Sequence, residues 1–459
     1  LAAPGASLAC RRAAPTLHDA LASAGFEVEG GTGLRDEHAI TRARFAPRFT
    51  PRRAPARVRG RATIDPQVLI VGAGLAGCAA AWALAEQGWR SSVFDRHAQI
   101  GAEASGNPAG LFHGTVNAHD GVHARIHRAA ALAAHDAVQI ALERHGAAGS
   151  AQGLLRLETT LGLEQMRAIL AHQGLPPDYV QALGADRSSA HAGIPLADPA
   201  WFYPGGGWVD PAGLARSFLE RAKSSAVLQP HAADVQALRR STSGWSLLDT
   251  QGRVIAEAPT VVLANAADAL RLLGAPAWPV ELIRGQISTL EAPSAKLALP
   301  RLPIAGAGYL LPSVDGRAVF GATAQAGDLD ASVRLADHAT NLAQLERLVG
   351  HRLDVDAADL QGRTAWRCSA RDRLPVIGPV PDLTQALQAA RLDQPRFVPR
   401  LPGLFVFTAL GSRGITWSAL GAQLLASFVT GAPAPLEASL LDAVDPARFI
   451  SRQARRAAG

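Results

Sequence analysis

The sequence predicts an α/β fold that combines a parallel strand–helix–strand unit with an antiparallel sheet. The parallel unit is Val68–Asp95, where an apolar run, a glycine turn, a helical stretch and a second apolar run follow one another. Three short runs of β-forming residues, 283–290, 309–311 and 318–322, predict the antiparallel sheet. A second strand–glycine–helix junction at residues 404–430 supports the same class.

The glycine turn at Gly72, Gly74 and Gly77 has the spacing of a dinucleotide-binding motif. Gly72 allows a tight turn, Gly74 leaves room for a pyrophosphate, and Gly77 lets the helix lie close to the sheet. The free N–H groups and the positive dipole at the start of the helix would face the phosphates. Asp95 ends the second strand 18 residues after Gly77, where its carboxylate can accept hydrogen bonds from a ribose diol.

The helix of this unit is predicted to end at Gly88, a residue type that suits the position just after a helix. Two other interpretations compete. Residues 68–85 carry no charge, so a membrane span is conceivable. An ordinary crossover without a ligand is the other alternative. Three glycines at turn spacing and the lack of further apolar length favour the dinucleotide.

Composition is that of a globular chain of two or three domains, with 459 residues, 48% hydrophobic and 18% charged. The three cysteines are scattered and form neither a disulfide framework nor a metal motif, which is typical of a reducing, cytoplasmic setting. We find no signal peptide. The first residue is leucine rather than methionine, which indicates a fragment or a processed end.

The positive charge is concentrated near the N-terminus. Residues 1–65 carry a net charge of +5 out of the total of +6. Residues 41–62 hold eight arginines, three prolines and no acidic residue. This run is either a solvated linker that its charge keeps extended or a contact with a phosphate backbone. Before it, a strand at 6–10, a helix at 15–24 and a strand beginning at 26–28 are too short to form their own core.

Further elements are predicted between these landmarks. They are helices at 122–145, 212–223 and 335–349, two strands within 227–238, a hairpin at 245–255 and a buried strand at 261–266. Five histidines, His119, His123, His127, His135 and His145, lie in or just before the first helix. His123 and His127 are one turn apart, but no nearby carboxylate or cysteine completes a metal site. Packed or exposed histidines are therefore favoured over metal ligands.

Four segments in order are similar to FAD-dependent amine and D-amino acid oxidases, which include glycine and sarcosine oxidases. They are residues 72–95, the ASGNPAG segment at 104–110, residues 362–378 and the ALGSRGIT segment at 409–416. ASGNPAG and ALGSRG, with residues 283–288 and 441–448, resemble more closely the oxidoreductase half of the bacterial bifunctional tRNA 5-methylaminomethyl-2-thiouridine biosynthesis proteins. The resemblance covers residues 66–452, nearly the whole chain.

The resemblance implies an FAD-binding Rossmann-like domain interleaved with an antiparallel-sheet substrate domain, as in D-amino acid and glycine oxidases. The oxidoreductase would span 66–459, with FAD-binding parts at 66–155, 225–280 and 355–440 and substrate-domain parts at 156–224 and 281–354. Residues 1–50 resemble the end of the family's methyltransferase domain, and 51–65 would be a linker. No glycine-rich segment precedes them to hold S-adenosylmethionine, so we expect no methyl transfer.

The reaction that the resemblance implies is an oxidation of the carboxymethylaminomethyl group on the tRNA wobble uridine. The N–CH₂ bond is oxidised by FAD, the imine hydrolyses, and glyoxylate leaves behind an aminomethyl base. The protein has to hold the reacting carbon against the flavin and tune its electronics. A dedicated general base is optional. The expected partners are FAD and tRNA, with no metal and no membrane.

Two arginines are the catalytic candidates. Arg367 matches the arginine of the family pattern Arg-x-x-x-x-Asp-x-x-Pro-x-x-Gly and would bind the substrate carboxylate with two parallel bonds. The alternative is a structural pair between Arg367 and Asp372. Arg413, between glycines, would stabilise the reduced flavin. The predicted cofactor-binding residues are Gly72, Gly74, Gly77, Asp95, Ser105, Gly106, Asn107, Val235, Ala264, Gly411, Ser412 and Gly414, with Gly110, Gly285 and Gln286 as second-rank candidates near the ring.

Two other functions remain open at this point. A small-molecule oxidase of glycine, sarcosine or a D-amino acid would share the fold and the flavin. A non-catalytic flavoprotein that binds tRNA belongs to a different class, although the intact cofactor motifs argue against it. The segment after ASGNPAG departs from the family's aromatic-rich pattern, since it reads LFHGTVN at 111–117 and includes His113. The shape of the pocket is therefore not predicted.

Overall fold

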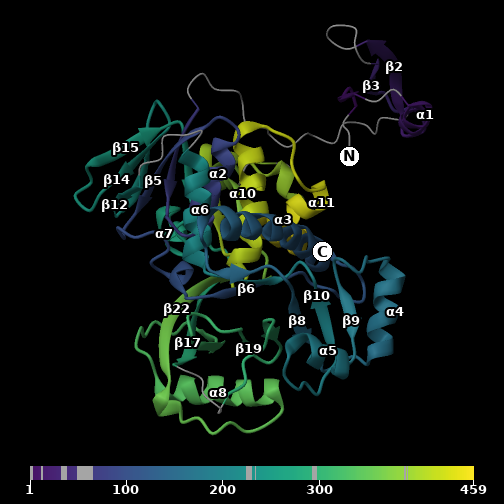
Figure 1. Cartoon of the computed structure of the whole chain (residues 1–459). Coiled ribbons are helices and arrows are strands. Elements are labelled where there is room, and N and C mark those ends of the chain that lie inside the picture. Colours follow the sequence, from purple (N-terminus) through teal and green to yellow (C-terminus); the bar gives the residue numbers. More distant parts are fainter. Residues whose placement is uncertain are drawn as a thin grey trace. The chain divides into compact units, whose positions relative to one another are not determined.

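The computed structural model describes residues 4–11, 14–32, 39–48, 66–223, 230–232, 234–291, 297–386, 389 and 391–458. The chain divides into two compact units, Leu1–Val58 and Arg59–Gly459 (Figure 1). Most of the arginine-rich run predicted at 41–62 lies outside the described residues, as do residues 227–229 of the strands predicted at 227–238.

The smaller unit is a three-stranded antiparallel sheet with one helix. Its elements are β1 (Ser7–Cys10), α1 (Pro15–Ser23), β2 (Phe26–Thr32) and β3 (Ala39–Phe45), and the strand order is β1-β3-β2. Phe26 and Phe45 are paired across β2 and β3 with ring centroids 5.0 Å apart. The two strands and the helix predicted within residues 6–28 are confirmed. Their origin in a methyltransferase domain stays a prediction.

The larger unit is built on a six-stranded sheet of order β12-β5-β4-β16-β24-β23, parallel except for the antiparallel β23. Its strands are β4 (Gln67–Val71), β5 (Arg90–Asp95), β12 (Pro230–Ala232), β16 (Thr260–Leu263), β23 (Val376–Pro381) and β24 (Arg400–Thr408). Helix α2 (Leu75–Ala85) connects β4 to β5. The N–H groups of Gly88 and Trp89 donate to the carbonyls of Ala85 and Leu84, so Gly88 ends this helix in a Schellman turn, as predicted.

Side chains alternate across the parallel sheet, and each face is covered by a different layer. Val68 and Ile70 of β4 pack against helices, whereas Leu69 and Val71 pack against a small antiparallel sheet (Figure 1). The helices are α2, α3 (Val122–His145), α6 (Pro211–Lys223) and α10 (Gly414–Thr430), and the small sheet is β13 (Ala237–Arg240), β14 (Trp245–Leu248) and β15 (Val254–Ala258). This three-layer arrangement buries both faces of the parallel strands.

A second large sheet, mostly antiparallel, has nine strands. Along the order β21-β17-β20-β19-β18-β8-β10-β9 they are Gln325–Ala326, Val280–Leu290, Ala318–Gly321, Tyr309–Leu310, Ile304–Ala305, Leu154–Leu157, Ala200–Tyr203 and Gln181–Leu183; β22 (Gln361–Ala370) pairs with β17. Helix α8 (Leu335–Val349) packs on it through Leu345 and Leu348. The strands predicted at 283–290, 309–311 and 318–322 are confirmed as antiparallel neighbours.

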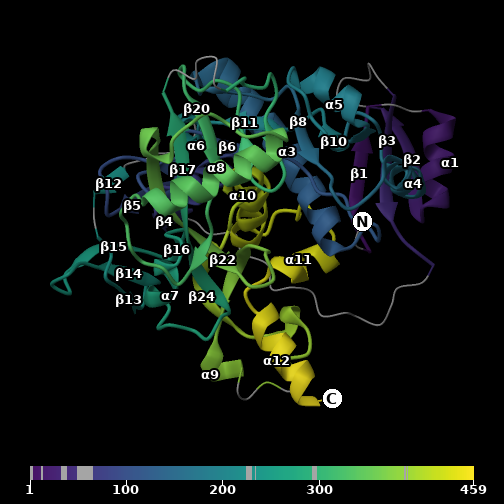
Figure 2. The ribbon, with the colours of Figure 1, turned by 90° about the horizontal axis from the view of Figure 1, so that it is seen from below.

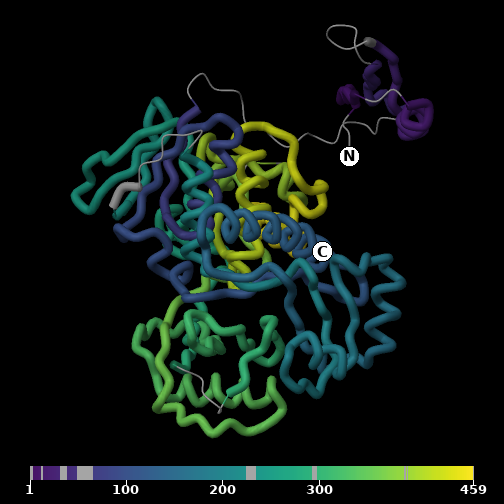
Figure 3. The backbone as a smooth tube through the Cα atoms, in the orientation of Figure 1, coloured from purple at the N-terminus to yellow at the C-terminus, as the bar shows by residue number. Residues whose placement is uncertain are grey.

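The chain passes twice between the two sheets. Figure 3 traces it from the parallel sheet into β8–β10, back to α6 and β13–β16, out again to β17–β22 and finally into β24 and α10. The fold is therefore the predicted α/β arrangement of two interleaved parts. Segments from both passes line a single cavity, so residues far apart in the sequence meet at one site.

Two elements belong to the other part of the fold than the one predicted for them. Helix α6, assigned to the substrate domain, packs in the helical layer of the parallel sheet, where Phe218 stacks on Trp82 with ring centroids 5.2 Å apart. Strand β22, assigned to the FAD-binding part, pairs along its whole length with β17 of the antiparallel sheet. Amphipathic spacing predicts that these segments are buried, but not which sheet buries them.

The remaining elements are short, apart from two helices beside the antiparallel sheet and one at the C-terminus. They are η1 (Ala104–Gly106), β6 (Gly110–Phe112), β7 (Gly149–Ser150), α4 (Leu163–Gln173), α5 (Ala185–Ala192), β11 (Gly207–Val209), α7 (Asp268–Leu272), η2 (Ala357–Asp359), α9 (Leu383–Ala386), η3 (Pro395–Phe397), α11 (Ala438–Val444) and α12 (Arg448–Ala458). Figure 2 shows α12 running out to the C-terminus. Within the described ranges, each helix is too short or too polar to cross a bilayer.

Candidate active site

A cavity of about 850 Å³ lies where the parallel strands end, with residues of both large sheets in its wall. This is a usual place for a ligand in an α/β sheet, and the volume is in the upper part of the range of about 300–1,000 Å³ that ligand cavities span. One end of the cavity is lined by the turns after β4, β5, β16 and β24. The other end is lined by β8, β17, β19 and β22.

The turn after β4 has no room for side chains at two of its three glycines. Gly72 has a φ of +109°, and a Cβ there would lie 2.6 Å from the carbonyl oxygen of Ala264. A Cβ on Gly77 would lie 1.8 Å from the carbonyl oxygen of Gly72, so this glycine sets how closely α2 approaches the turn. Gly72 and Gly74 line the cavity, whereas Gly77 does not and serves only to pack α2 against the turn.

The ASGNPAG loop completes the wall around the start of α2. Ser105 Oγ accepts a hydrogen bond of 3.1 Å from the N–H of Leu75 in the first turn of that helix. Asn107 Oδ1 accepts one of 2.5 Å from Arg363 Nη1. Ser105 and Asn107 line the cavity, but Gly106 does not: a Cβ there would meet the Gly101 carbonyl oxygen at 2.4 Å, so its role is to let the loop fold.

Asp95 lies at the end of β5 and faces the cavity. Its Oδ2 accepts from the N–H of Ala73 at 2.7 Å, and its Oδ1 accepts from the N–H of His97 at 2.8 Å. A carboxylate has about four acceptor positions, so two stay available for a ribose diol. Val235 and Ala264, both nearly buried, line the same end.

The second strand–glycine–helix junction also faces the cavity, as predicted. Gly411 has a φ of +58°, and its N–H donates to the carbonyl oxygen of Cys368 at 2.8 Å. Helix α10 begins at Gly414, after Arg413 at the N-cap, and Ser412 lies in the same turn. Two helix N-termini, two tight glycine turns and one carboxylate with acceptor positions to spare therefore meet in one cavity, which fits a dinucleotide cofactor.

The far end of the cavity contains Arg367 on β22. Its Nη2 donates to the carbonyl oxygen of Thr323 at 2.7 Å. A Cβ on Gly285, on the neighbouring strand β17, would lie 2.1 Å from the same nitrogen, so the glycine makes room for the guanidinium. Burial lowers the pKa of Arg367, an effect that the nearby Tyr309 partly offsets. An arginine stays protonated nonetheless.

The alternative pairing of Arg367 with Asp372 is wrong. Asp372 accepts from Arg448 Nε at 2.8 Å and Nη2 at 3.0 Å, and from Arg452 Nη1 at 2.6 Å. Within the described ranges, the ion pairs leave Arg367 without a carboxylate. Its charge is therefore available to an anionic ligand in the cavity.

Arg413 and Arg156 add two more positive charges to the wall of the same cavity. Arg413 Nη1 donates to the carbonyl oxygen of His113 at 3.3 Å. Burial lowers the pKa of Arg413, and the charge of Arg156 lowers it further. Burial also holds the pKa of His113 well below its ordinary value, and both arginines add to that effect. His113 is therefore neutral beside two cations that have no carboxylate partner among the described residues.

Three residues with possible functional roles were not predicted from the sequence. Arg156 is an exposed position in the otherwise buried strand β8, and one charge inside the apolar run LLRL was the available signal. Arg363 donates from Nη2 to the carbonyls of Ala102 and Glu103, and thereby ties β22 to the ASGNPAG loop. Tyr309 lines the cavity, and burial raises its pKa to about 12, so its phenol keeps the proton.

The side chain of Gln286 does not line the cavity, contrary to the second-rank expectation. Its side chain is fully buried and bonded to the backbone of Arg334 at 2.9 Å and 2.8 Å. Alternate residues of a strand point to opposite faces, so Gly285 and Ile287 face the cavity side and Gln286 faces the other way. Gly110 does line the cavity.

The histidines of α3 do not gather around a common point. Within the described ranges, there is no cluster of three or more metal-ligating side chains. His127 packs edge-on against Trp417 at 5.4 Å between ring centroids, and its Nδ1 is bonded to the carbonyl oxygen of His123. Burial lowers the pKa of His127 to about 3. This histidine is a neutral packing residue.

Residues 67–428 match the FAD dependent oxidoreductase family. The chain is 47% identical over 462 residues to the tRNA 5-methylaminomethyl-2-thiouridine biosynthesis bifunctional protein MnmC of Methylibium petroleiphilum, covering 98% of this chain and 70% of that protein. The MnmC protein of Paraburkholderia xenovorans is 38% identical, with 99% and 70% covered.

Among solved structures, iminodiacetate oxidase from Chelativorans sp. BNC1 is 26% identical with a TM-score of 0.62, over 83% of this chain and 98% of that one. Glycine oxidase from Geobacillus kaustophilus is 25% identical with a TM-score of 0.62, over 82% and 97%. The cofactor is therefore FAD, as the glycine turns and helix ends indicate. The chain belongs to the FAD-dependent oxidoreductase family and, within it, to the tRNA-modifying flavoenzymes named MnmC.

Proposed function

We propose that this protein oxidises the carboxymethylaminomethyl group of wobble uridine in tRNA, releasing glyoxylate and leaving an aminomethyl group. One observation carries the proposal. The cavity that fits FAD at one end presents three guanidinium groups, those of Arg156, Arg367 and Arg413, at the other, with no carboxylate partner among the described residues. Such an end suits a substrate with several negative charges better than one with a single carboxylate.

The relatives support this substrate class from two directions. The MnmC proteins are named for the biosynthesis of a modified tRNA uridine. The structural relative is named for iminodiacetate, a secondary amine that bears two carboxymethyl arms. The proposed substrate is likewise a secondary amine with a carboxymethyl arm, so the reacting N–CH₂–COO⁻ group is the same in both.

The cofactor would be held by the glycine turn of Gly72 and Gly74, the start of α2, Asp95 and the start of α10. Bound FAD supplies a hydride acceptor. The substrate carbon loses the hydride, and the nitrogen lone pair forms the C=N bond. Water then adds to this bond, the C–N bond breaks, and glyoxylate and a primary amine are released.

The residues of the far end have distinct roles in this reaction. Arg367 binds the substrate carboxylate and fixes the adjacent CH₂ group. Arg413 lies at the start of α10, where its charge favours the anionic reduced cofactor. The three cations also disfavour a protonated substrate amine, which keeps the lone pair available. Tyr309 and His113 are neutral and can donate or accept hydrogen bonds without changing the charge.

A small-molecule oxidase is the competing function, because glycine oxidase shares the fold at 25% identity. Steady-state assays separate the two. Purified holoenzyme is given tRNA with carboxymethylaminomethyl-uridine, tRNA with aminomethyl-uridine, free glycine or free sarcosine, and glyoxylate is measured. We expect turnover of the first tRNA at micromolar concentration and none of the second. Turnover of free glycine at a similar concentration, with the tRNA unreactive, would favour the competitor.

We also infer that residues 1–50 form the end of a methyltransferase part and that 51–65 form a linker. The support is that the relatives, named bifunctional, match 98% or more of this chain, including this segment. The reaction described here needs none of these residues, so removal of residues 1–65 should leave FAD binding intact. Action on tRNA corresponds to a cytoplasmic enzyme.

A further inference from the structure

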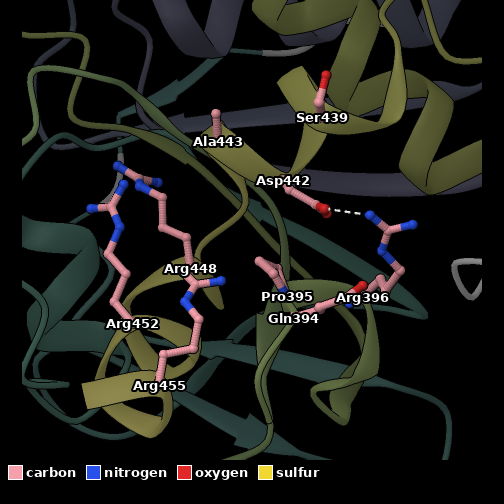
Figure 4. A pocket seen from close by; sticks show the side chains of 9 residues that line it. All are labelled: Gln394, Pro395, Arg396, Ser439, Asp442, Ala443, Arg448, Arg452 and Arg455. Atoms are coloured by element: carbon pink, nitrogen blue, oxygen red, sulfur yellow. Dashed lines mark hydrogen bonds and ion pairs between the residues drawn. The ribbon is translucent and has the colours of Figure 1, made fainter. Parts of the chain in front are cut away.

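A second pocket, of about 430 Å³, shares no lining residue with the active-site cavity. It lies between α11, α12 and the segment around η3, and Figure 4 shows the three arginines of α12 on one side, with Arg396 and Asp442 on the other. We call it the arginine pocket. It is lined by Gln394, Pro395, Arg396, Ser439, Asp442, Ala443, Arg448, Arg452 and Arg455.

The four arginines have different partners. Arg448 is buried and bound to Asp372 through two nitrogens, so it anchors the helix. Arg452 is 39% exposed and bonds to the same carboxylate, and Arg396 pairs with Asp442 at 2.6 Å. Arg455 is exposed and, among the described residues, donates to the carbonyl oxygen of Asp393 at 2.9 Å and to no other partner.

The pocket therefore has more positive charge than its acids neutralise. Four of the residues that line it are arginines, and Asp442 is acidic; Asp372 accepts from two of these arginines, and the carboxylate of Asp393 also feels the charge of Arg455. Helix α12 contains four arginines and no acidic residue, whereas residues 66–459 as a whole carry a net charge of only +1. The concentration of arginine is local to this helix.

The helix dipole does not explain this arrangement. Basic residues stabilise the C-terminal turn of a helix, where Arg455 and Arg456 lie. Arg448 and Arg452, however, lie in the first half of α12, where the dipole disfavours positive charge. Asp372 holds these two in place. The pocket thus concentrates charge at some electrostatic cost, which is typical of a binding site for an anion.

The arginine pocket is also close to the strand that carries the substrate arginine. Asp372 follows Arg367 by five residues, and a fully extended chain of that length spans at most ~18 Å. A nucleic acid whose base enters the active site would have backbone phosphates within that range, because they recur every few ångströms along a strand.

We propose that the arginine pocket binds backbone phosphates of the tRNA substrate, through Arg452 and Arg455. The proposal rests on tRNA being the substrate. Planar guanidinium groups bind phosphate oxygens with two parallel hydrogen bonds, and such contacts position a nucleic acid without reading its sequence. The pocket would therefore contribute affinity for any tRNA, while the active site selects the modified base.

The test uses the full chain with FAD bound and the variants Arg452→Gln and Arg455→Glu. Arg347→Glu is the matched control, since Arg347 is also exposed on a helix and, within the part of the chain that the structure describes, is bonded to a backbone carbonyl alone. The affinity for tRNA is measured by fluorescence anisotropy at several salt concentrations, and kcat and KM are measured with modified tRNA and with the free modified nucleoside.

We expect each pocket variant to weaken tRNA binding about three- to tenfold and to reduce the salt slope by about 0.7–0.9, the value of one phosphate contact. KM for tRNA should rise while kcat and the nucleoside kinetics stay unchanged. Affinity and salt slope equal to those of Arg347→Glu would overturn the pocket proposal and leave the proposed function standing. Failure of the unmodified protein to bind or oxidise the tRNA would overturn both.

Discussion

The two ends of the active-site cavity are built by different means. The cofactor end consists of glycine turns, backbone N–H groups and one carboxylate, and its central motif occupies 24 residues from Gly72 to Asp95. The substrate end consists of three charged side chains from β8, β22 and the start of α10, of which the first and last are more than 250 residues apart along the chain. The cofactor end uses local backbone geometry, whereas the substrate end uses long-range assembly of charge.

Substitutions at the two ends should therefore have different effects on the enzyme. A change at the cofactor end should lower the affinity for FAD, whereas a change at the substrate end should leave FAD bound and impair turnover. Arg367, Gly285 and Arg156 belong to the substrate end and Asp95 to the cofactor end, and a substitution with the opposite effect would contradict this division.

Arg367→Ala should have the largest effect. Removal of one partner of a buried charge-assisted contact costs about 2–5 kcal/mol, so kcat/KM should fall by roughly 30-fold or more while the flavin spectrum is unchanged. Stopped-flow reduction and steady-state kinetics measure both quantities. Arg367→Lys keeps the charge but not the planar fork, and should recover only part of the activity. Turnover equal to that of the unmodified protein would remove Arg367 from its role.

Gly285→Ala should act on the same group from the neighbouring strand. The added methyl group would lie 2.1 Å from Arg367 Nη2 and must displace the guanidinium. We expect kcat/KM to fall about tenfold, because small misplacements of a positioning group are costly. Gly30→Ala, a strand position with open space around it, is the control. If the variant lost affinity for FAD but kept its turnover, Gly285 would belong to the cofactor end.

Asp95→Ala should lower the affinity for FAD about tenfold. The carboxylate accepts from the backbone at Ala73 and His97, and its loss removes these bonds together with the proposed ribose contact. Isothermal titration of apoprotein with FAD measures the change. Asp95→Asn retains one acceptor oxygen, so its affinity for FAD should lie between that of Asp95→Ala and that of the unmodified protein. Once the cofactor is saturating, kcat should be normal, and a persistent loss of kcat would contradict the separation of the ends.

Arg156→Ala should have the smallest effect, about a fivefold rise in KM for modified tRNA. Arg156 is exposed at the cavity wall, so solvent screens its charge. The free nucleoside lacks phosphates, so its kinetics should change less than those of the tRNA. Arg187→Ala, another exposed arginine, is the control. Equal effects on tRNA and nucleoside would mean that Arg156 contacts the base rather than a phosphate.

The same contrast explains what the sequence could predict. The bounds of α3 and α8 agree with the predicted helices, because regular apolar spacing and the glycines at 146 and 350 mark their ends. The glycine motif and the second helix junction are local and were predicted with their residues. Arg156, the side to which Gln286 points and the place of α6 depend on strand register and on packing between distant segments. Local pattern can mark such a residue as unusual, as the single charge in LLRL does for Arg156, but it does not say what the residue faces.

The most direct test of the account is a single-turnover experiment without oxygen. Holoenzyme is mixed with tRNA that carries carboxymethylaminomethyl-uridine, flavin absorbance is followed, and glyoxylate is measured after quenching. We predict loss of the oxidised flavin spectrum with one glyoxylate released per flavin reduced, and in Arg367→Ala both signals should appear roughly 30-fold more slowly or slower still. Flavin that stays oxidised in the presence of saturating modified tRNA, or is reduced without release of glyoxylate, would contradict the proposed reaction.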